Sequence, residues 1–303
     1  MVALAEVRCE IRDLRVHDYK SHISKSHISY LKTIFAATKN KIMQERHNDR
    51  RRYFEEQVYT TEKYVIPFVD EVMPVTKNIS VLEIGCGEGG NMKPFLDLGC
   101  KVVGIDLNTK QIENAKVYFS DHPNQANLEL ILRDIYEMKP DELGEFDLII
   151  MRDVIEHIHN QEKFMAYVKQ FLKPKGTFFL GFPPWQMPFG GHQQIAKHKY
   201  LSKLPFYHLL PMSIYNSILK AAGEGDKVRN ELLEIKETGI SIERFRRILK
   251  TENYTVNKEV MYLFNPNYDI KFGLQPKEQF GLFKAIPYFR NFATTCCFYL
   301  ISR

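Results

Sequence analysis

Two acidic side chains flank a glycine-rich loop in the first half of the sequence. Glu83 lies within the apolar run 81–84, the glycine-rich residues 85–90 follow, and the next apolar run, 101–105, ends at Asp106. Glycines let a backbone approach a ligand without a Cβ collision, and the free N–H groups of a following helix can bind that ligand. A carboxylate offers acceptors to the two hydroxyls of a ribose. The pattern therefore predicts a pocket for a nucleoside cofactor.

Two kinds of cofactor fit this loop. Gly85, Gly87 and Gly90 also satisfy the G-x-G-x-x-G spacing of dinucleotide-binding folds. The charge of Glu83 would oppose a pyrophosphate but suits a cationic ligand or one that carries an amino acid. Asp134 follows a third apolar run, where an acceptor can bind an adenine amino group. These two acids favour a nucleoside that carries an amino acid over a dinucleotide.

A second set of chemical groups lies further along the chain. Asp153, Glu156 and His157 have the i, i+3, i+4 spacing that places side chains on one helical face. This set either packs a helix or binds a metal. The segment 183–194 contains the chain's only tryptophan, Trp185, together with a Gly-Gly pair and His192. An aromatic plate with a few polar groups suits a small-molecule pocket, and histidine is the usual general base near neutral pH.

The elements that must position these groups alternate between strands and helices. Such alternation predicts a doubly wound parallel sheet with helices on both faces and right-handed crossovers. The expected strands are 81–84, 101–105, 128–132, 146–151, 177–182, 254–264 and 294–301. The expected helices are 92–98, 109–119 with Thr109 as N-cap, 161–172, and 240–249 opened by Ser241. Ligands of open α/β sheets bind beyond the carboxyl ends of the strands, where both sets of groups then lie.

Two regions of the sequence do not follow the strand–helix alternation. The helical spacing of apolar residues within 1–78 predicts a helical cap. Its helices are expected at Ile28–Ile42 and Tyr53–Val72, with a break at Pro67. Residues 183–238 interrupt the strand–helix alternation of the domain at 79–303 and hold a helix near 212–222. They are expected to form a substrate lid together with the cap. Tyr59 and Tyr64 are expected to close on the cofactor.

Composition and charge narrow the class of protein. Hydrophobic residues make up 44% of the 303-residue chain, enough for a sizeable core, and no apolar run approaches the ~20 residues that span a bilayer. The five cysteines lack metal or redox spacing, which indicates a reduced, cytoplasmic protein. Residues 1–52 hold 12 Lys/Arg and 6 Asp/Glu, a balance of +6. This arm is either a solvated helix or a site for an anionic substrate or nucleic acid.

Five blocks of the sequence resemble the class I S-adenosylmethionine-dependent methyltransferases. They are the residues 81–89, Asp106, Asp134, the block 146–157 and the block 172–179, so the likeness is strong over 80–183 and weak over 240–303. It implies a Rossmann-like seven-stranded sheet in the order 3-2-1-4-5-7-6, with strand 7 antiparallel. It also implies S-adenosyl-L-methionine as the cofactor, with the glycines at its methionine end, Asp106 at the ribose, and Asp134 with Ile135 at the adenine. The full set of implied cofactor residues is Glu83, Gly85, Cys86, Gly87, Gly89, Asp106, Leu107, Asp134, Ile135 and Arg152.

The acceptor is less sharply defined by the sequence. The loop around Trp185 and His192 resembles methyltransferases of bacterial surface-polysaccharide pathways, which implies O- or N-methylation of a sugar or nucleotide-linked intermediate. His192 is then the catalytic base, and Trp185, His157 and Tyr200 contact the substrate. No metal is expected.

Other readings of the acceptor stay open. Asp153, Glu156 and His157 are similar to the divalent-metal motif of the ubiquinone-pathway O-methyltransferases, which has Glu where this chain has Asp153, and His192 could complete that site. An RNA methyltransferase would use the basic arm. Strand 4 lacks the Asn/Asp-Pro-Pro-Tyr block of base-methylating enzymes, so nucleic acid is the weaker expectation. A non-catalytic binding protein and an oligomer also stay open.

Overall fold

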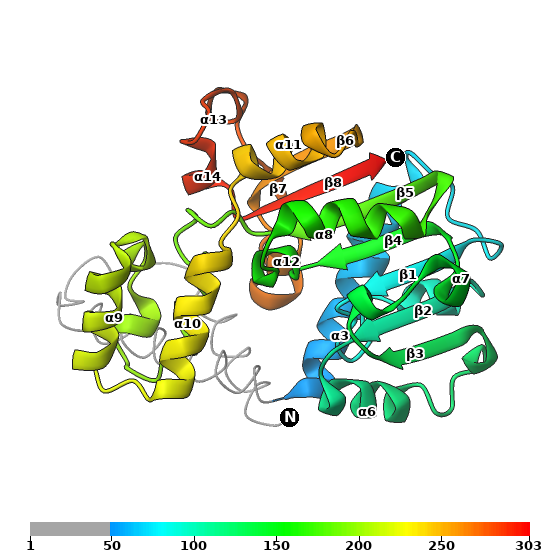
Figure 1. Ribbon diagram of the computed structural model, residues 1–303, viewed down its shortest axis with the longest axis horizontal. Coiled ribbons are helices and arrows are strands. Elements are labelled where there is room, and N and C mark those ends of the chain that lie inside the picture. The colour runs from blue at the N-terminus through cyan, green and yellow to red at the C-terminus, as the bar shows by residue number, and fades with distance from the viewer. Residues whose placement is uncertain (1–48) are drawn as a thin grey trace, which may run out of the picture. The chain divides into compact units, whose positions relative to one another are not determined.

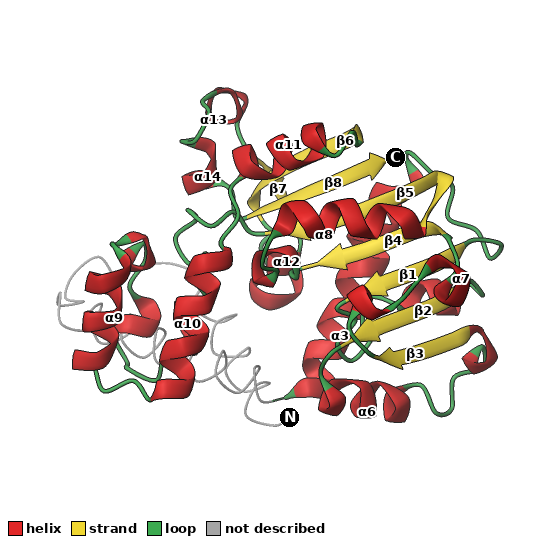
Figure 2. Ribbon diagram, in the orientation of Figure 1, coloured by secondary structure: helices red, strands yellow, loops and turns green. Residues whose placement is uncertain are grey.

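The computed structural model describes residues 49–303, and residues 50–303 form one compact unit. The predicted helix at Ile28–Ile42 and nearly all of the basic arm lie outside the described residues. A single twisted sheet runs through the described part of the chain, with helices on both of its faces (Figures 1 and 2). The mixed α/β architecture predicted from the alternation is confirmed.

The sheet has eight strands in the order β3-β2-β1-β4-β5-β8-β6-β7. The final long strand pairs antiparallel with both neighbours, whereas strands 1 to 5 pair in parallel. The predicted order is thus confirmed, but the predicted count of seven is wrong by one. The additional edge strand has only two residues, too few to leave a pattern in the sequence. The strands are β1 Ser80–Ile84, β2 Lys101–Asp106, β3 Leu128–Leu132, β4 Phe146–Arg152, β5 Leu172–Phe182, β6 Thr255–Phe264, β7 Lys277–Glu278 and β8 Cys296–Ser302.

The helices follow the predicted alternation with small shifts at their ends. Asn108, not Thr109, caps the helix after β2, because its side chain accepts from Gln111 N at 3.2 Å. Ser241 caps its helix as predicted and accepts from Arg244 N at 3.1 Å. The α-helices are α3 Arg50–Thr60, α4 Ile66–Asp70, α5 Lys93–Asp97, α6 Thr109–Tyr118, α7 Pro140–Leu143, α8 Gln161–Val168, α9 Met212–Ala221, α10 Asp226–Thr238, α11 Ile242–Thr251, α12 Asn267–Phe272, α13 Gly281–Ala285 and α14 Arg290–Ala293.

Strand β5 begins five residues earlier than the sequence indicates. The residues 173–176, Lys-Pro-Lys-Gly, were expected to end a helix, yet they lie inside the strand. Phe146 pairs with Leu172 and Leu148 pairs with Thr177, so an irregularity in the register absorbs the extra residues. A proline and a glycine are tolerated there because this part of the ladder is not regularly paired.

Alternating strand residues divide the core into two layers. In β1, Leu82 packs with α8 and α11 on one face, and Val81 packs with α3 to α6 on the other. This division follows from the two-residue period of a strand. Figure 1 shows α8 and α11 covering one face and α3 behind the other.

The helical segment before β1 is interrupted earlier than the predicted break at Pro67. A π-helical turn, Thr61–Val65, separates α3 from α4, and Pro67 then lies in the first turn of α4, where its missing N–H has no cost. Phe54, Val65 and Val69 are buried against the sheet. The segment is therefore part of the same compact unit as the strands.

Residues 183–238 build a small cluster of their own. Tyr207, Tyr215, Leu219 and Leu232 are buried together between α9 and α10. The predicted helix near 212–222 is confirmed, whereas α10 was not anticipated. Across residues 49–303, no helix is both long and apolar enough to cross a membrane.

Candidate active site

The glycine loop after β1 adopts backbone conformations that only glycine accepts easily. Gly85, Gly87 and Gly89 have φ angles of 72°, 54° and 85°. A Cβ at position 85 would lie 2.6 Å from a methyl of Val154. The loop is thus held open in a left-handed path, and a larger residue at Gly85 would force a collision as well as strain.

Asp106 at the end of β2 closes this loop from the neighbouring strand. Its carboxylate accepts from Gly87 N at 2.8 Å and from Asn108 N at 2.7 Å. Each carboxylate oxygen has a second acceptor site, so the half-buried Asp106 can still receive two hydroxyls. Leu107, beside it, is 70% exposed.

The residues expected at the adenine lie after β3. Asp134 caps a short 3-10 turn by accepting from Tyr136 N at 3.0 Å, and Ile135 is buried. Cys86, in the glycine loop, is also buried, and this burial raises the pKa of its thiol well above the usual range. The thiol therefore behaves as a small apolar group.

Asn91 connects the loop to three other elements, and sequence reasoning missed it. Its side chain donates to Glu83 Oε1 at 2.7 Å. Its oxygen accepts from Thr61 Oγ1 and from Arg152 Nη1, each at 2.9 Å. Arg152 also donates to Asn267. The position of Asn91 directly after the glycines was the available signal.

Glu83 is almost fully buried and has one unsatisfied oxygen. Burial raises its pKa to about 8, although the bond from Asn91 and the charge of Arg152 oppose that rise. Its Oε2 has no hydrogen-bond partner within residues 49–303. A buried acceptor without a partner is costly, so the pocket is suited to a ligand that brings a cationic donor. The glycine cradle and this acceptor together fit the amino-acid end of S-adenosylmethionine.

Glu83 should make the ligand-free protein less stable as pH rises. Its pKa is higher in the folded chain than in the unfolded chain, so the folded state binds the extra proton between about pH 4.5 and 8, with a slope of about 1.4 kcal/mol per pH unit for one proton. We expect Glu83→Gln to flatten the fall in unfolding free energy over this range in denaturant titrations. The exposed Glu129→Gln is the control. Equal slopes for both variants and the wild type would contradict the assignment.

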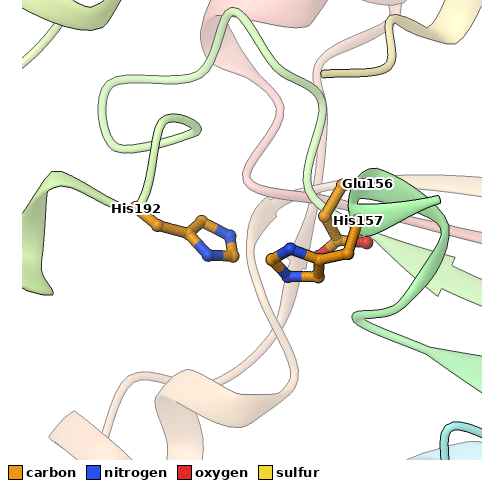
Figure 3. A group of neighbouring side chains, drawn as sticks. All are labelled: Glu156, His157 and His192. Carbon is orange, nitrogen blue, oxygen red and sulfur yellow. The ribbon is translucent and has the colours of Figure 1, made fainter. Parts of the chain in front are cut away.

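Glu156, His157 and His192 come together beyond the ends of β4 and β5. One ligand atom from each lies within 4.8 Å of the others (Figure 3). The rings of His157 and His192 are 5.0 Å apart between centroids. Glu156 and His157 lie in a 3-10 turn after β4, and His192 lies in the loop after β5. Parallel neighbouring strands end at the same edge, which brings the two segments together.

Asp153 is not a member of this group among the residues described. It stands at a φ of 56° and its carboxylate lies 3.8 Å from Arg152 Nε. The i, i+3, i+4 spacing puts Asp153 with Glu156 and His157, whereas in the structure His192 is the third member of that group. The turn that follows β4 is not an α-helix, so the helical spacing on which that argument rested is absent.

The carboxyl group of Glu156 is buried in the cluster without a hydrogen-bond partner among residues 49–303. The residue is 3% exposed. Burial and then the charge of Asp153 raise the pKa of Glu156 well above its usual range. Partial desolvation by the surrounding protein lowers the pKa of His157, although the residue as a whole is exposed. The cluster can therefore accept a proton or a cation.

The loop that carries His192 is fixed by a buried histidine that sequence reasoning did not single out. His208 Nε2 bonds the carbonyl of Trp185 at 2.9 Å, and its Nδ1 bonds Gln193 Nε2 at 3.1 Å. A Cβ at Gly191 would collide with the His208 side chain, 2.4 Å from its Cβ and 2.6 Å from its ring carbon Cγ. Burial lowers the pKa of His208 to about 4, so the ring is neutral near pH 7 and donates from Nε2.

Trp185 is half-buried in this scaffold. Its ring packs edge-on against His208 at 4.7 Å and lies beneath Lys236 Nζ at 5.4 Å. A side chain at Gly239 would collide with the same ring. The indole therefore holds the base of the loop in place.

The remaining candidate tyrosines contact residues other than the three of the cluster. Tyr200 is 72% exposed, with its ring beside His198. The hydroxyls of Tyr59 and Tyr64 both donate to Asp269 of α12 at 2.7 Å. These bonds tie the helical segment before β1 to α12. The expected closure of both tyrosines on the cofactor stays a prediction.

The sequence of the sheet region matches a known domain family. Residues 82–180 match the model described as "Methyltransferase domain". A ubiquinone biosynthesis O-methyltransferase of Bartonella quintana is 34% identical over 126 residues, which are 40% of this chain and 49% of that protein. The Bartonella bacilliformis enzyme of the same name is 27% identical over 53% of this chain and 68% of that protein. The chain spans about half the length of the first of these relatives.

Solved structures share the fold at low sequence identity. A putative sarcosine dimethylglycine methyltransferase from Galdieria sulphuraria has a TM-score of 0.52 and 15% identity, over 80% of this chain and 84% of that one. Geranyl diphosphate C-methyltransferase from Streptomyces coelicolor A3(2) has a TM-score of 0.50 and 14% identity, over 80% of each chain. The chain shares the Rossmann-like fold of these methyltransferases, and residues 82–180 match the methyltransferase domain model. The domain match supports S-adenosylmethionine as the cofactor.

Proposed function

We propose that the protein is an S-adenosylmethionine-dependent O-methyltransferase that acts on a small-molecule hydroxyl. The observation that carries the proposal is the convergence of Glu156, His157 and His192 at the carboxyl ends of β4 and β5, in a segment whose Val154 lies against Gly85 of the glycine loop. The relatives with O-methyltransferase names support oxygen as the accepting atom. Residues 183–238 are the proposed lid over the acceptor.

The cofactor side of the site rests on the loop network. When bound, S-adenosylmethionine supplies a methyl group on an electrophilic sulfonium. Glu83 Oε2 would receive the ammonium of its amino-acid end, and Asp106 would receive its ribose hydroxyls. Asn91 holds Glu83 in register, and Arg152 holds Asn91. The chain thus fixes the direction in which the methyl faces the acceptor, and such positioning supplies much of the acceleration of a displacement.

The acceptor side needs a group that takes the hydroxyl proton. A ring nitrogen of His192 would accept that proton as the new carbon–oxygen bond forms. Trp185 and His208 hold the loop of His192 through the contacts described above, and His157 stands against its ring. The half-buried ring would then pass the proton to water, and the carboxyl of Glu156 lies within 4.8 Å of a ring nitrogen of His192.

The acceptor itself can be identified by turnover. Purified protein is incubated with labelled S-adenosylmethionine and two acceptor sets, phenols with adjacent hydroxyls and nucleotide-linked sugars. The sugar-linked acceptor is the expectation from the sequence, and the phenol set is chosen because of the relatives' names. Label in an O-methyl group of either set supports the proposal and selects the acceptor class. Labelling of nitrogen or carbon alone would overturn it.

A divalent cation in the same cluster is a second candidate, and one observation favours it. Two imidazoles and a buried carboxylate whose own oxygens have no hydrogen-bond partner among residues 49–303 are a ligand set typical of catalytic metal sites with open positions. A bound cation would also explain why the carboxyl of Glu156 is buried there. In this case His192 would be a ligand rather than the base, and the cation would lower the pKa of the acceptor hydroxyl.

Removal of metal separates the two candidates. If the cation is required, EDTA should lower turnover by about 10²-fold or more and added Mg²⁺, Mn²⁺ or Zn²⁺ should restore it. Glu156→Gln should then raise the cation concentration needed for half-maximal activity. Full activity of protein shown to be metal-free by elemental analysis would exclude the cation and leave His192 as base. The exposed Glu137→Gln is the matched control.

A further inference from the structure

Exposed apolar side chains gather on two segments that are distant in the sequence. We call residues 197–214 and 279–292 together the apolar–basic surface. On the first segment the exposed apolar residues are Tyr200, Leu204, Phe206, Leu210, Met212 and Ile214. On the second they are Phe280, Leu282, Ile286, Tyr288, Phe289 and Phe292. A concentration of this kind marks an interaction site rather than ordinary surface.

A row of aromatic rings joins the two segments. Phe206 lies 6.2 Å from Phe292, Phe292 lies 6.5 Å from Phe289, Phe289 lies 5.6 Å from Phe283, and Phe283 lies 6.3 Å from Phe280. The second segment carries α13 and α14, which project beside α11 in Figure 1. The rings therefore form one continuous feature that ends on a protruding pair of short helices.

Two aromatic residues of this surface are held in a conformation that costs free energy. Phe206 and Tyr288 have φ angles of 65° and 64°, which bulky residues rarely adopt. Phe206 N donates to Pro188 O at 2.9 Å, and Tyr288 N donates to Glu243 Oε1 at 2.7 Å. Strain of this type persists where the surrounding structure enforces it, and it clusters at functional positions. Here it presents two rings to solvent, 39% and 70% exposed.

The charge of the surface has a single sign. The two segments contain five Lys/Arg and no Asp/Glu. Lys284 pairs with Glu278 and Arg290 pairs with Glu243, so the excess positive charge rests on Lys197, Lys199 and Lys203, which are exposed. The complementary partner is therefore anionic as well as apolar.

We propose that the apolar–basic surface docks on the face of an anionic lipid bilayer. Leucine, isoleucine and methionine side chains would enter the boundary between headgroups and acyl chains, Tyr288 would lie at that boundary, and the lysines would meet lipid phosphates. RNA would use the rings and the lysines but offers nothing to the exposed aliphatic side chains. A second copy would set two surfaces of the same charge against each other.

Vesicle binding by the full chain tests this proposal. Cosedimentation is measured with vesicles of phosphatidylcholine alone and with vesicles that also contain phosphatidylglycerol. The intact protein should bind the anionic vesicles more tightly. The double variant Leu282→Asp/Phe289→Asp should bind them about tenfold less tightly or worse, since two apolar side chains no longer enter the interface. Val117→Asp, on α6, is the control because Val117 is 69% exposed, close to the 73% of Leu282.

The charge contribution is measured separately. Lys199→Glu/Lys203→Glu should weaken binding to anionic vesicles only, with the exposed pair Lys110→Glu/Lys116→Glu on α6 as control. Residues 1–48 are the same in every variant, so their contribution cancels. Unchanged melting temperatures show that each variant is folded.

Three results would overturn the proposal. The first is wild-type binding by the Leu282→Asp/Phe289→Asp variant. The second is absence of vesicle binding together with a dimer, seen in sedimentation velocity, that the same variant abolishes. The third is absence of vesicle binding together with salt-dependent RNA binding that the same variant abolishes.

Discussion

Replacing His192 with asparagine should lower turnover by about 10²- to 10⁴-fold while cofactor affinity stays unchanged. The side chain lies in the cluster beyond β4 and β5 and makes no part of the glycine loop. Asparagine is chosen because position 192 has a φ of 51°, which asparagine tolerates far better than alanine. The backbone of the loop is then preserved while the imidazole is lost.

The measurement compares single-turnover rates with binding of S-adenosylhomocysteine. His159→Asn is the matched control, since His159 is exposed and bonds Glu234 outside the cluster. Full activity of the His192 variant would remove it as base and as ligand. A fall in cofactor affinity equal to the fall in rate would assign the residue to binding instead.

Removing the carboxylate of Asp106 should abolish the stabilisation of the protein by S-adenosylhomocysteine. At a hundredfold excess over its dissociation constant, a ligand adds about 2.7 kcal/mol to the free energy of unfolding, or roughly 4–5 °C in melting temperature for a chain of this size. Asp106→Ala removes the proposed ribose acceptors and the bonds to Gly87 N and Asn108 N, so the loop also loses its closure. The expected shift for the variant is close to zero.

A control separates loss of binding from loss of folding. Asp121→Ala, in the exposed turn after α6, should keep the full ligand-induced shift. Circular dichroism of Asp106→Ala without ligand checks that the sheet is intact. A normal shift in Asp106→Ala would place the ribose elsewhere, and no shift in the intact protein would contradict S-adenosylmethionine as cofactor.

Local sequence pattern was sufficient for much of the fold. Strand and helix periodicity predicted the parallel sheet, whereas the antiparallel terminal strand was implied by the resemblance to the methyltransferases and is confirmed by its pairing with β5 and β6. The pattern failed where local signals are weak or misleading. The two residues of β7 are too few to show alternation, and the proline and glycine at 174 and 176 suggested a break where the register of β5 absorbs them.

The sequence by itself determined the proposed cofactor end of the site, because that end is made of residues close together in the chain. Gly85, Gly87 and Gly89 must be glycine for local backbone reasons, and Asp106 follows the next strand directly. Tertiary structure decided the rest. It brought His192 to Glu156 and His157 through the pairing of β4 with β5, and it left Asp153 outside that group.

Tertiary structure also revealed the residues that position the site. Asn91 and His208 act through partners that are distant in the sequence, and no local pattern marks such partners. The same holds for the apolar–basic surface, where Phe206 meets Phe292 only after folding. Contacts between distant segments depend on how the elements pack, whereas a turn or a strand depends on its own residues.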